Sequence, residues 1–171
     1  MNASVRVAVD LLVPARVVLL GDVLLADGAV GTNLFAAGLQ TGDAPELWNI
    51  EHPDRIRALH ASFVESGSDV ILTNTFGGTH YRLALHNAGH QVAQINRAAV
   101  SLAREVAQAA GNDGVRNGHR AIVAGSMGPT GEILAPNGNV SIDEARRAFA
   151  EQAEALAGAG VDVLWIETLS S

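Results

Sequence analysis

The sequence predicts an α/β protein built on a parallel β-sheet, and three observations support this fold class. Four short apolar runs close on polar or glycine residues without polar alternation, as expected for parallel strands covered on both faces. Helical patterns with recognisable ends separate these runs. The chain has 171 residues, of which 48% are hydrophobic, and this is enough for one domain with a sizeable core. Strands that alternate with helices imply right-handed βαβ units.

The four predicted strands occupy the segments VLLADGAVGT, DVILTNTFGG, AIVAGSMGPTG and VDVLWIETLSS, at residues 23–32, 69–78, 121–131 and 161–171. They start roughly 40 to 50 residues apart, whereas a minimal (β/α)8 barrel uses ~30 residues per unit. The additional residues follow the strands, for example in the segment EILAPNGNV. Extra chain at that end enlarges the C-terminal face of the sheet, where such barrels carry their active sites.

Three helices are predicted between these strands. Pro53 suits the first turn of one helix, and an apolar stripe with helical spacing starts at Val92. Ser141 and Glu144 form the capping-box pattern that starts the third helix. Glycines provide the stop signals at Gly67, Gly111 and Gly158. The glycine-rich segment 111–119 is predicted to form a surface loop at the opposite, N-terminal face of the sheet.

Polar residues cluster where the predicted strands end. They are Asp27 and Gly28 after the first strand, Thr73, Asn74 and Thr75 after the second, Ser126, Gly128 and Thr130 after the third, and Glu167 and Thr168 after the fourth. The carboxyl ends of parallel strands lie on one side of a sheet, so we expect these residues to surround one crevice.

Each of these positions also has a purely structural interpretation. Asp27 before Gly28 suits an Asx-turn or a helix cap, and Asn74 can bond its own backbone in a turn. The segment GSMGPTG is rich in glycine like a phosphate-binding loop, but it lacks the lysine of a P-loop. Glu167 favours a function more strongly, because a carboxylate directly after the apolar run VLWI is partly desolvated and needs a cation or hydrogen-bond donors.

Composition excludes several classes of function. The net charge of -7 argues against a general nucleic-acid binder, which needs clusters of Lys and Arg. No apolar run approaches the roughly 18 residues that span a bilayer. Residues 1–19 are apolar but interrupted by Asp10 and Pro14, and we interpret them as an N-terminal extension. We therefore expect a cytoplasmic protein that binds neither nucleic acid nor a membrane, as a monomer or a homo-oligomer.

The six histidines do not predict a metal site. Only His86 and His90 have a spacing that suits two ligands on one helix face, and Gly89 between them indicates a helix end at the surface. Trp48 and Trp165 are predicted to anchor the core or a loop, and Trp48 is the better candidate for lining a cleft.

Five segments, in this order and at this spacing, resemble the homocysteine S-methyltransferase family. They are LLADGAVGTNLF, APELWNIEHPDRI, SGSDVILTNTFGG, AIVAGSMGPTGEI and GVDVLWIET, and they cover nearly all of residues 20–171. In detail they are most similar to bacterial betaine–homocysteine methyltransferases. The resemblance implies a (β/α)8 TIM barrel, of which residues 20–171 supply about the first four βα units, the N-terminal half of the homocysteine-binding domain.

The resemblance also implies an activity and a set of binding residues. The activity is transfer of a methyl group to the thiolate of homocysteine to give methionine, with betaine as the favoured methyl donor. Asp27, the backbone of Gly28, and Glu167 would bind the ammonium group of homocysteine, and the segment TNTF would line the pocket. The implied substrate-binding residues are Asp27, Gly28, Asn74, Thr75, Glu167 and Thr168.

Members of this family hold zinc with three cysteines from later strands, but this chain contains no cysteine and ends after four predicted strands. We therefore expect a truncated domain that holds neither metal ligands nor catalytic residues and is inactive alone. Two other interpretations stay open. One is a non-catalytic amino acid-binding half-barrel, and the other is an unrelated barrel enzyme for a phosphorylated substrate. S-methylmethionine and methyl-cobalamin are the alternative methyl donors.

Overall fold

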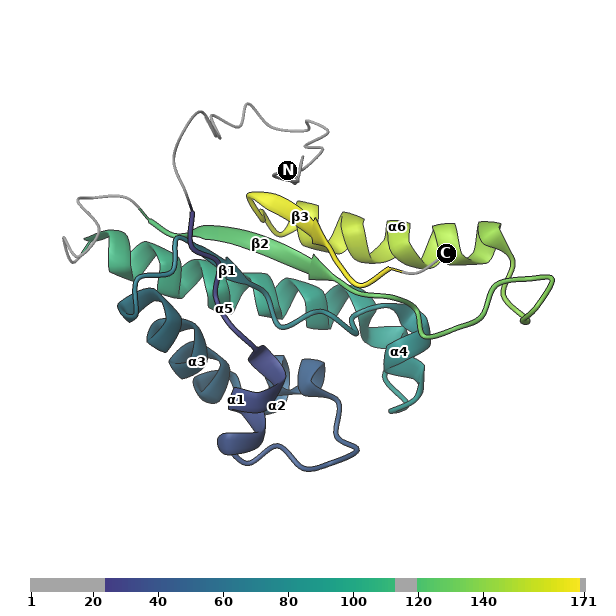
Figure 1. The fold of residues 1–171 in the computed structure, drawn as a ribbon, viewed down its shortest axis with the longest axis horizontal. Helices are drawn as coiled ribbons and strands as arrows, with labels where there is room; N and C mark the ends of the chain where they lie inside the picture. Colours follow the sequence, from purple (N-terminus) through teal and green to yellow (C-terminus); the bar gives the residue numbers. More distant parts are fainter. Residues whose placement is uncertain (1–23, 113–119, 170–171) are drawn as a thin grey trace, which may run out of the picture.

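The computed structural model describes residues 24–112 and 120–169. The helices are α1 (Val30–Ala36), η1 (Pro45–Leu47), α2 (Trp48–Glu51), α3 (Pro53–Glu65), α4 (His80–Ala84), η2 (Gly89–Gln91), α5 (Val92–Asn112) and α6 (Ile142–Gly158), where η denotes a 3-10 helix. The strands are β1 (Val70–Leu72), β2 (Ile122–Met127) and β3 (Val163–Ile166). Helices and strands alternate from α3 onward (Figure 1), which confirms the predicted α/β fold class.

The three strands form one parallel sheet in the order β1, β2, β3. Val70 of β1 pairs with Ile122 of β2, and Ala124 of β2 pairs with Val163 of β3. The strands all run in one direction, so their carboxyl ends lie on one side of the sheet, as the sequence predicts.

The prediction of a first strand at residues 23–32 is wrong, because the structure has no strand in the part of this segment that it describes. Ala26 alone forms a parallel bridge with Val70. The pairing stays short because, within the described residues, the segment pairs only with β1 and because α1 already begins at Val30. Leu25 is consequently 56% exposed. The segment still runs beside β1, so the residues that follow the bridge reach the same side of the sheet as the ends of the other strands.

The prediction that every strand is covered on both faces is wrong for β3. Its first three residues are half-buried and Ile166 is 63% exposed. The central strand β2, in contrast, is buried from Val123 onward. The physical reason is position: β2 has a neighbouring strand on each side, whereas β3 pairs only with β2 within the described residues.

Helices α3, α5 and α6 form one layer against the sheet (Figure 1), in which α5 contacts both α3 and α6. Pro53 occupies the first turn of α3, as predicted. The predicted capping box of α6 is present, because the Glu144 N–H donates to Ser141 Oγ and the Ser141 N–H donates to Glu144 Oε2. The helix ends differ slightly from the prediction, since α5 extends one residue past Gly111 and α6 includes Gly158.

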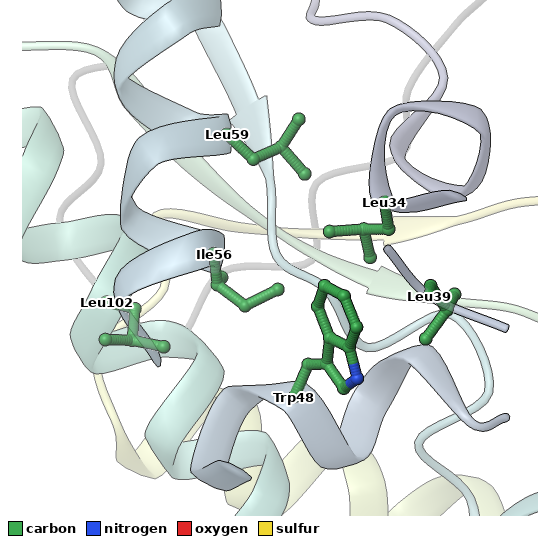
Figure 2. Packing of buried hydrophobic residues seen from close by; sticks show 6 residues of the cluster. All are labelled: Leu34, Leu39, Trp48, Ile56, Leu59 and Leu102. Atoms are coloured by element: carbon green, nitrogen blue, oxygen red, sulfur yellow. The ribbon is translucent and has the colours of Figure 1, made fainter. Parts of the chain in front are cut away.

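One apolar cluster joins α1, α2, α3 and α5, and Figure 2 shows its side chains pointing toward one another. Its buried members are Leu34, Leu39, Trp48, Ile56, Leu59 and Leu102. Burial of each large apolar side chain stabilises the fold by roughly 1.5–3 kcal/mol. Trp48 is only 5% exposed, and the guanidinium carbon of Arg55 lies 4.9 Å from its ring centroid. Trp48 is therefore a core anchor, as predicted.

A cluster of charges stabilises the N-terminal end of β2 and β3. Asp162, one residue before β3, accepts hydrogen bonds from Arg104 at 2.9 Å and from Arg120 at 2.7 and 2.8 Å. It also accepts one from the Val123 N–H at 2.8 Å. Burial alone would raise the pKa of Asp162, but these donors lower that pKa to about 2. The Asp162 carboxylate therefore stays ionised at neutral pH and links two strands to α5.

Two predicted segments lie outside the described residues: the whole N-terminal extension at 1–19 and most of the predicted loop at 111–119. In the part of the chain that the structure describes, no helix has the length and apolar character that a membrane span requires. The expected cytoplasmic location and the expected lack of nucleic-acid binding stay predictions.

Candidate functional site

Asp27 follows the bridge at Ala26 and lies beside the end of β1. Its N–H donates to the Val70 carbonyl at 2.9 Å, and its Oδ2 accepts from the Leu72 N–H at 2.9 Å. Burial raises the pKa of Asp27 to about 6, the Leu72 N–H opposes this rise, and the negative charge of Glu167 adds to it. The backbone of β1 therefore holds Asp27 in a place where its charged form is disfavoured until a cation arrives.

Glu167 directly follows β3 and is half-buried. Its N–H donates to the Met127 carbonyl at 3.1 Å, so the backbone pairing with β2 continues one residue past the strand. Its Oε1 accepts a hydrogen bond from Ser126 Oγ at 2.7 Å. Ser126, one of the polar residues at the predicted strand ends, thus orients the Glu167 carboxylate.

Asp27 and Glu167 come from opposite edges of the sheet, with β1 and β2 between them. On a flat sheet, three strand spacings would separate them by about 14 Å. The charge of Glu167 nevertheless acts on the pKa of Asp27, as expected if the sheet curves and brings the strand ends together. Within the described chain, no arginine or lysine forms an ion pair with either acid. The arrangement is suited to bind a cation such as an ammonium group.

Asn74 and Thr75 lie in the loop after β1, and their side chains are buried. The Asn74 amide donates to the Pro45 carbonyl at 2.7 Å and to Asn49 Oδ1 at 3.2 Å. The Thr75 hydroxyl donates to the Ser126 carbonyl at 2.7 Å. These side chains hold the loop after β1 through contacts inside the protein. Their assignment as substrate-binding residues stays a prediction.

Gly28 and Thr168 are the exposed members of the predicted set. A Cβ atom at Gly28 would lie 3.3 Å from the ring of Phe63, so the backbone approaches α3 closely there. Thr168 has a φ of 59°, in the left-handed region that β-branched residues rarely adopt. Such backbone outliers cluster at functional sites, and this one directly follows Glu167. A substrate-binding role for these two residues also stays a prediction.

Three buried polar residues surround the loop after β1, and they were not predicted from the sequence. Glu46 is 7% exposed, and its Oε1 accepts a hydrogen bond from the Gly77 N–H at 2.6 Å. Asn96 on α5 and Gln152 on α6 are fully buried. A signal was present for both helices, because each polar residue occupies a position that buried apolar residues hold one turn before and one turn after.

An open cavity of about 510 Å³ lies between the segment before η1, helix α2 and the end of α4. Trp48 lines it, as the sequence analysis predicts for a cleft, together with Arg55 and His86. The cavity lining contains none of the six predicted substrate-binding residues. The cavity and the pair of acids are therefore separate features.

The histidines of the described chain do not form a metal centre. No group of three or more His, Asp or Glu side chains suited to a metal ion occurs in residues 24–112 and 120–169. His90 is exposed and His86 half-buried, in agreement with the predicted surface location. His60 is fully buried on α3, and burial lowers its pKa to about 4, so it is neutral at physiological pH.

The family model for homocysteine S-methyltransferase matches residues 24–171. The match includes both acids and the loop after β1, and it spans most of the chain. The chain belongs to the homocysteine S-methyltransferase family. The family predicted from the five sequence segments is thereby confirmed.

Two curated relatives are methionine synthases of mycobacteria. The protein of Mycobacterium tuberculosis (strain ATCC 25618 / H37Rv) is 31% identical over 152 residues, which is 85% of this chain and 12% of the relative. The protein of Mycobacterium leprae (strain TN) is 30% identical over 152 residues, again 12% of the relative. The chain therefore spans a small part of the length of these relatives.

Solved structures of the homocysteine methyltransferase MmuM from Escherichia coli are similar to this chain. The metallated form matches with a TM-score of 0.73 and 30% identity, over 86% of this chain and 54% of that protein. The apo form matches with a TM-score of 0.64 and 26% identity, over 51% of that protein. This homocysteine S-methyltransferase family member thus spans about half the length of its structural neighbour and shares its α/β fold with a parallel sheet.

Proposed function

We propose that this chain is the homocysteine-binding part of an enzyme that transfers a methyl group to homocysteine and gives methionine. The observation that carries the proposal is that Asp27 and Glu167, two half-buried acids after parallel strand segments, have no ion-pair partner in the described chain, and that the charge of Glu167 adds to the raised pKa of Asp27. The ammonium group of an amino acid supplies the positive charge that this pair lacks. Membership of the family and the names of the relatives support homocysteine as that amino acid.

In this proposal, the residues of the chain bind and orient the substrate. Asp27 and Glu167 accept charge-assisted hydrogen bonds from the ammonium group. Binding of this cation offsets the desolvation of Asp27, whose proton then leaves near neutral pH. The backbone of Gly28 and the exposed Thr168 contact the amino acid part of homocysteine. The side chains of Asn74 and Thr75 hold the loop after β1 in place, and the backbone of this loop lines the pocket.

We further infer that residues 20–171 form the N-terminal half of a (β/α)8 TIM barrel. Two observations support this inference: the charge of Glu167 acts on Asp27 across the sheet, as in a sheet that curves, and the chain matches about half of the E. coli neighbour. In a closed barrel, further strands would pair with β3 and cover Ile166, which is 63% exposed. A cytoplasmic location, as a monomer or a homo-oligomer, is also a proposal.

Zinc, which the family generally uses, does not fit the residues of this chain. The chain contains no cysteine, and its described residues offer no group of three or more possible metal ligands. Betaine is the proposed methyl donor because the segments ADGAVGTNLF, GDAPELWNIEHPDRI and GSMGPTGEILAP resemble bacterial betaine–homocysteine methyltransferases most. S-methylmethionine and methyl-cobalamin are the alternative donors.

A second candidate function is a non-catalytic module that binds an amino acid. The observation that favours it is the presence of the complete acid pair in a chain whose described residues hold no metal-binding group. Both candidates predict that homocysteine binds to Asp27 and Glu167. They differ in whether the bound homocysteine is methylated.

Methionine formation separates the two candidates. The 171-residue chain is assayed with homocysteine and each of the three donors, alone and fused to the C-terminal half of a homocysteine methyltransferase barrel that carries the cysteines. We expect neither zinc retention nor methionine from the chain alone, and both from the fusion. Homocysteine binding without methionine from any fusion would favour the binding module. Methionine formation by the chain alone would contradict the assignment of catalysis to residues outside it.

A further inference from the structure

The loop after β1, defined here as Thr73–Thr79, is held on one side by a buried carboxylate. The Glu46 Oε1 accepts a hydrogen bond from the Gly77 N–H at 2.6 Å. Glu46 lies in η1, a segment that also contacts this loop through the Pro45 carbonyl and the Asn74 amide, 2.7 Å apart. A carboxylate that is 7% exposed is costly to bury, and here it is used to hold one backbone N–H.

Two amides hold the same loop from the helix layer. The Asn96 amide on α5 donates to the Gly78 carbonyl at 2.9 Å, and the Gln152 amide on α6 donates to the Thr75 carbonyl at 2.7 Å. The two amides also contact each other, with Gln152 Nε2 lying 3.3 Å from Asn96 Oδ1. Helices that are distant in sequence therefore meet at one short loop.

The glycines of the loop are required by these contacts. A Cβ atom at Gly78 would lie 2.6 Å from Asn96 Oδ1 and 2.8 Å from Gln152 Nε2. A Cβ atom at Gly77 would lie 2.8 Å from Glu46 Oε1. Real Cβ atoms essentially never approach other atoms this closely, so the polar side chains and the glycines specify one conformation together.

Two hydrogen bonds, through Thr75 and through Ser126 of β2, connect the loop to Glu167. Thr75 Oγ1 donates to the carbonyl of Ser126 at 2.7 Å, and Ser126 Oγ donates to Glu167 at 2.7 Å. The Thr73 hydroxyl adds an acceptor for the Ser126 N–H at 3.1 Å. A shift of the loop would therefore move the residue that orients Glu167.

The arrangement has a cost in stability that packing alone does not explain. Gln152 Oε1 is buried and has no hydrogen-bond partner within the described residues. A buried acceptor without a partner destabilises the fold, and an apolar residue of similar size would avoid this cost. Retaining an amide here is reasonable if its donor to Thr75 serves a purpose other than stability.

We propose that Glu46, Asn96 and Gln152 are positioning residues of the homocysteine site. They hold the loop Thr73–Thr79 from two sides, and through Thr75 and Ser126 they set the place of Glu167. This inference rests on the proposed function for the identity of the ligand, and on the hydrogen bonds alone for the positioning.

Two measurements on the 171-residue chain test the proposal: amide hydrogen exchange by NMR, and homocysteine affinity by calorimetry. In Glu46→Ala we expect the Gly77 amide to exchange about tenfold faster and the dissociation constant to rise about tenfold, as for loss of one hydrogen bond. Glu46→Gln keeps an oxygen acceptor, so it restores both values. Gly77→Ala disturbs the same contact from the loop side and provides a second variant if Glu46→Ala does not fold.

The amide variants have a matched control on α5. Asn96→Leu and Gln152→Leu should weaken homocysteine binding, whereas Gln94→Leu, at an exposed position of α5, should not. Glu51→Ala, at an exposed position of α2, is the control for Glu46→Ala. The proposal would be overturned if the exchange rate of the residue 77 amide and the affinity for homocysteine both stayed unchanged in Glu46→Ala and in Gly77→Ala.

The outcomes separate this inference from the proposed function. If the unmodified chain does not bind homocysteine, the proposed function and the ligand of this site are both wrong. The exchange rates of Gly77 and Gly78 still decide in that case whether the three side chains hold the loop. If homocysteine binds and the positioning variants bind it equally well, only the positioning inference is wrong.

Discussion

The strand β3 carries an acid at each end, and the two acids have opposite surroundings. Asp162 precedes the strand and accepts hydrogen bonds from Arg104 and Arg120, which hold its pKa near 2. Glu167 follows the strand, and its charge, together with burial, raises the pKa of Asp27 to about 6. The same sheet thus has a paired acid at its N-terminal end and, among the residues that the structure describes, two acids without an ion pair at its C-terminal end.

This contrast separates charges that stabilise the fold from charges that await a ligand. A paired carboxylate contributes stability whenever it is ionised, because its partners are always present. Two acids that face each other destabilise the ionised protein, and a bound cation relieves their repulsion. We therefore expect substitutions at the two ends to change stability in opposite directions.

The largest expected effect on stability is at Asp162. Asp162→Asn removes the charge that Arg104 and Arg120 face and should lower the free energy of unfolding by about 2–3 kcal/mol at pH 7. Because the pKa of Asp162 is lowered in the folded state, its contribution is complete above pH about 4 and is lost as the pH falls toward 2. Urea unfolding at pH 7 and pH 3 measures both effects.

An exposed ion pair provides the control for Asp162. Asp143 and Arg146 lie 3.1 Å apart on the surface of α6. Asp143→Asn should change the free energy of unfolding by no more than ~0.5 kcal/mol, because water screens such pairs. Equal losses in Asp162→Asn and Asp143→Asn would contradict the structural role given to Asp162.

The next effect concerns the pH dependence of homocysteine binding. In the proposed function, the ammonium group binds the ionised form of Asp27, and burial raises the pKa of Asp27 to about 6. We expect the affinity to be constant above pH 7 and to fall about tenfold for each pH unit below 6. Calorimetry between pH 5 and pH 8 gives this profile, and Asp27→Asn should remove the dependence. A profile that is flat in the unmodified chain would exclude Asp27 as the titrating ligand.

The smallest effect is a gain in stability at Asp27. Its pKa is raised in the folded state, so its ionisation lowers stability as the pH rises from about 4 to 6. Asp27→Asn keeps an oxygen acceptor for the Leu72 N–H and removes the charge. We expect the variant to be more stable by about 1 kcal/mol at pH 7 and unchanged at pH 3, a modest value because the carboxylate is only half-buried. Thermal unfolding at both pH values measures the difference, and a loss of stability at pH 7 would contradict it.

The sequence was sufficient to predict the features that depend on local pattern. The Ser141 capping box, Pro53 at the start of α3 and the apolar stripe from Val92 follow from residues close together in the chain. The two acids were also predictable, because Asp27 and Glu167 stand at the ends of apolar runs that parallel strands bring to one side.

The features that depend on distant neighbours were not predictable. The segment at residues 23–32 forms only one bridge, because strand pairing is decided by the neighbouring strand. The contacts of Glu46, Asn96 and Gln152 with the loop after β1 join elements up to 77 residues apart. No local pattern indicates which buried polar side chain will meet which backbone group.

The central claim is that Asp27 and Glu167 together bind the ammonium group of homocysteine. Calorimetry of the 171-residue chain with homocysteine, and with the analogue that lacks only the amino group, tests this most directly. We expect Asp27→Asn and Glu167→Gln each to weaken homocysteine binding by roughly 1.5–3 kcal/mol, whereas Asp43→Asn, a control outside the site, should leave it unchanged. Neither site variant should alter the weaker binding of the analogue. If both site variants bind homocysteine as tightly as the unmodified chain, Asp27 and Glu167 do not bind its ammonium group.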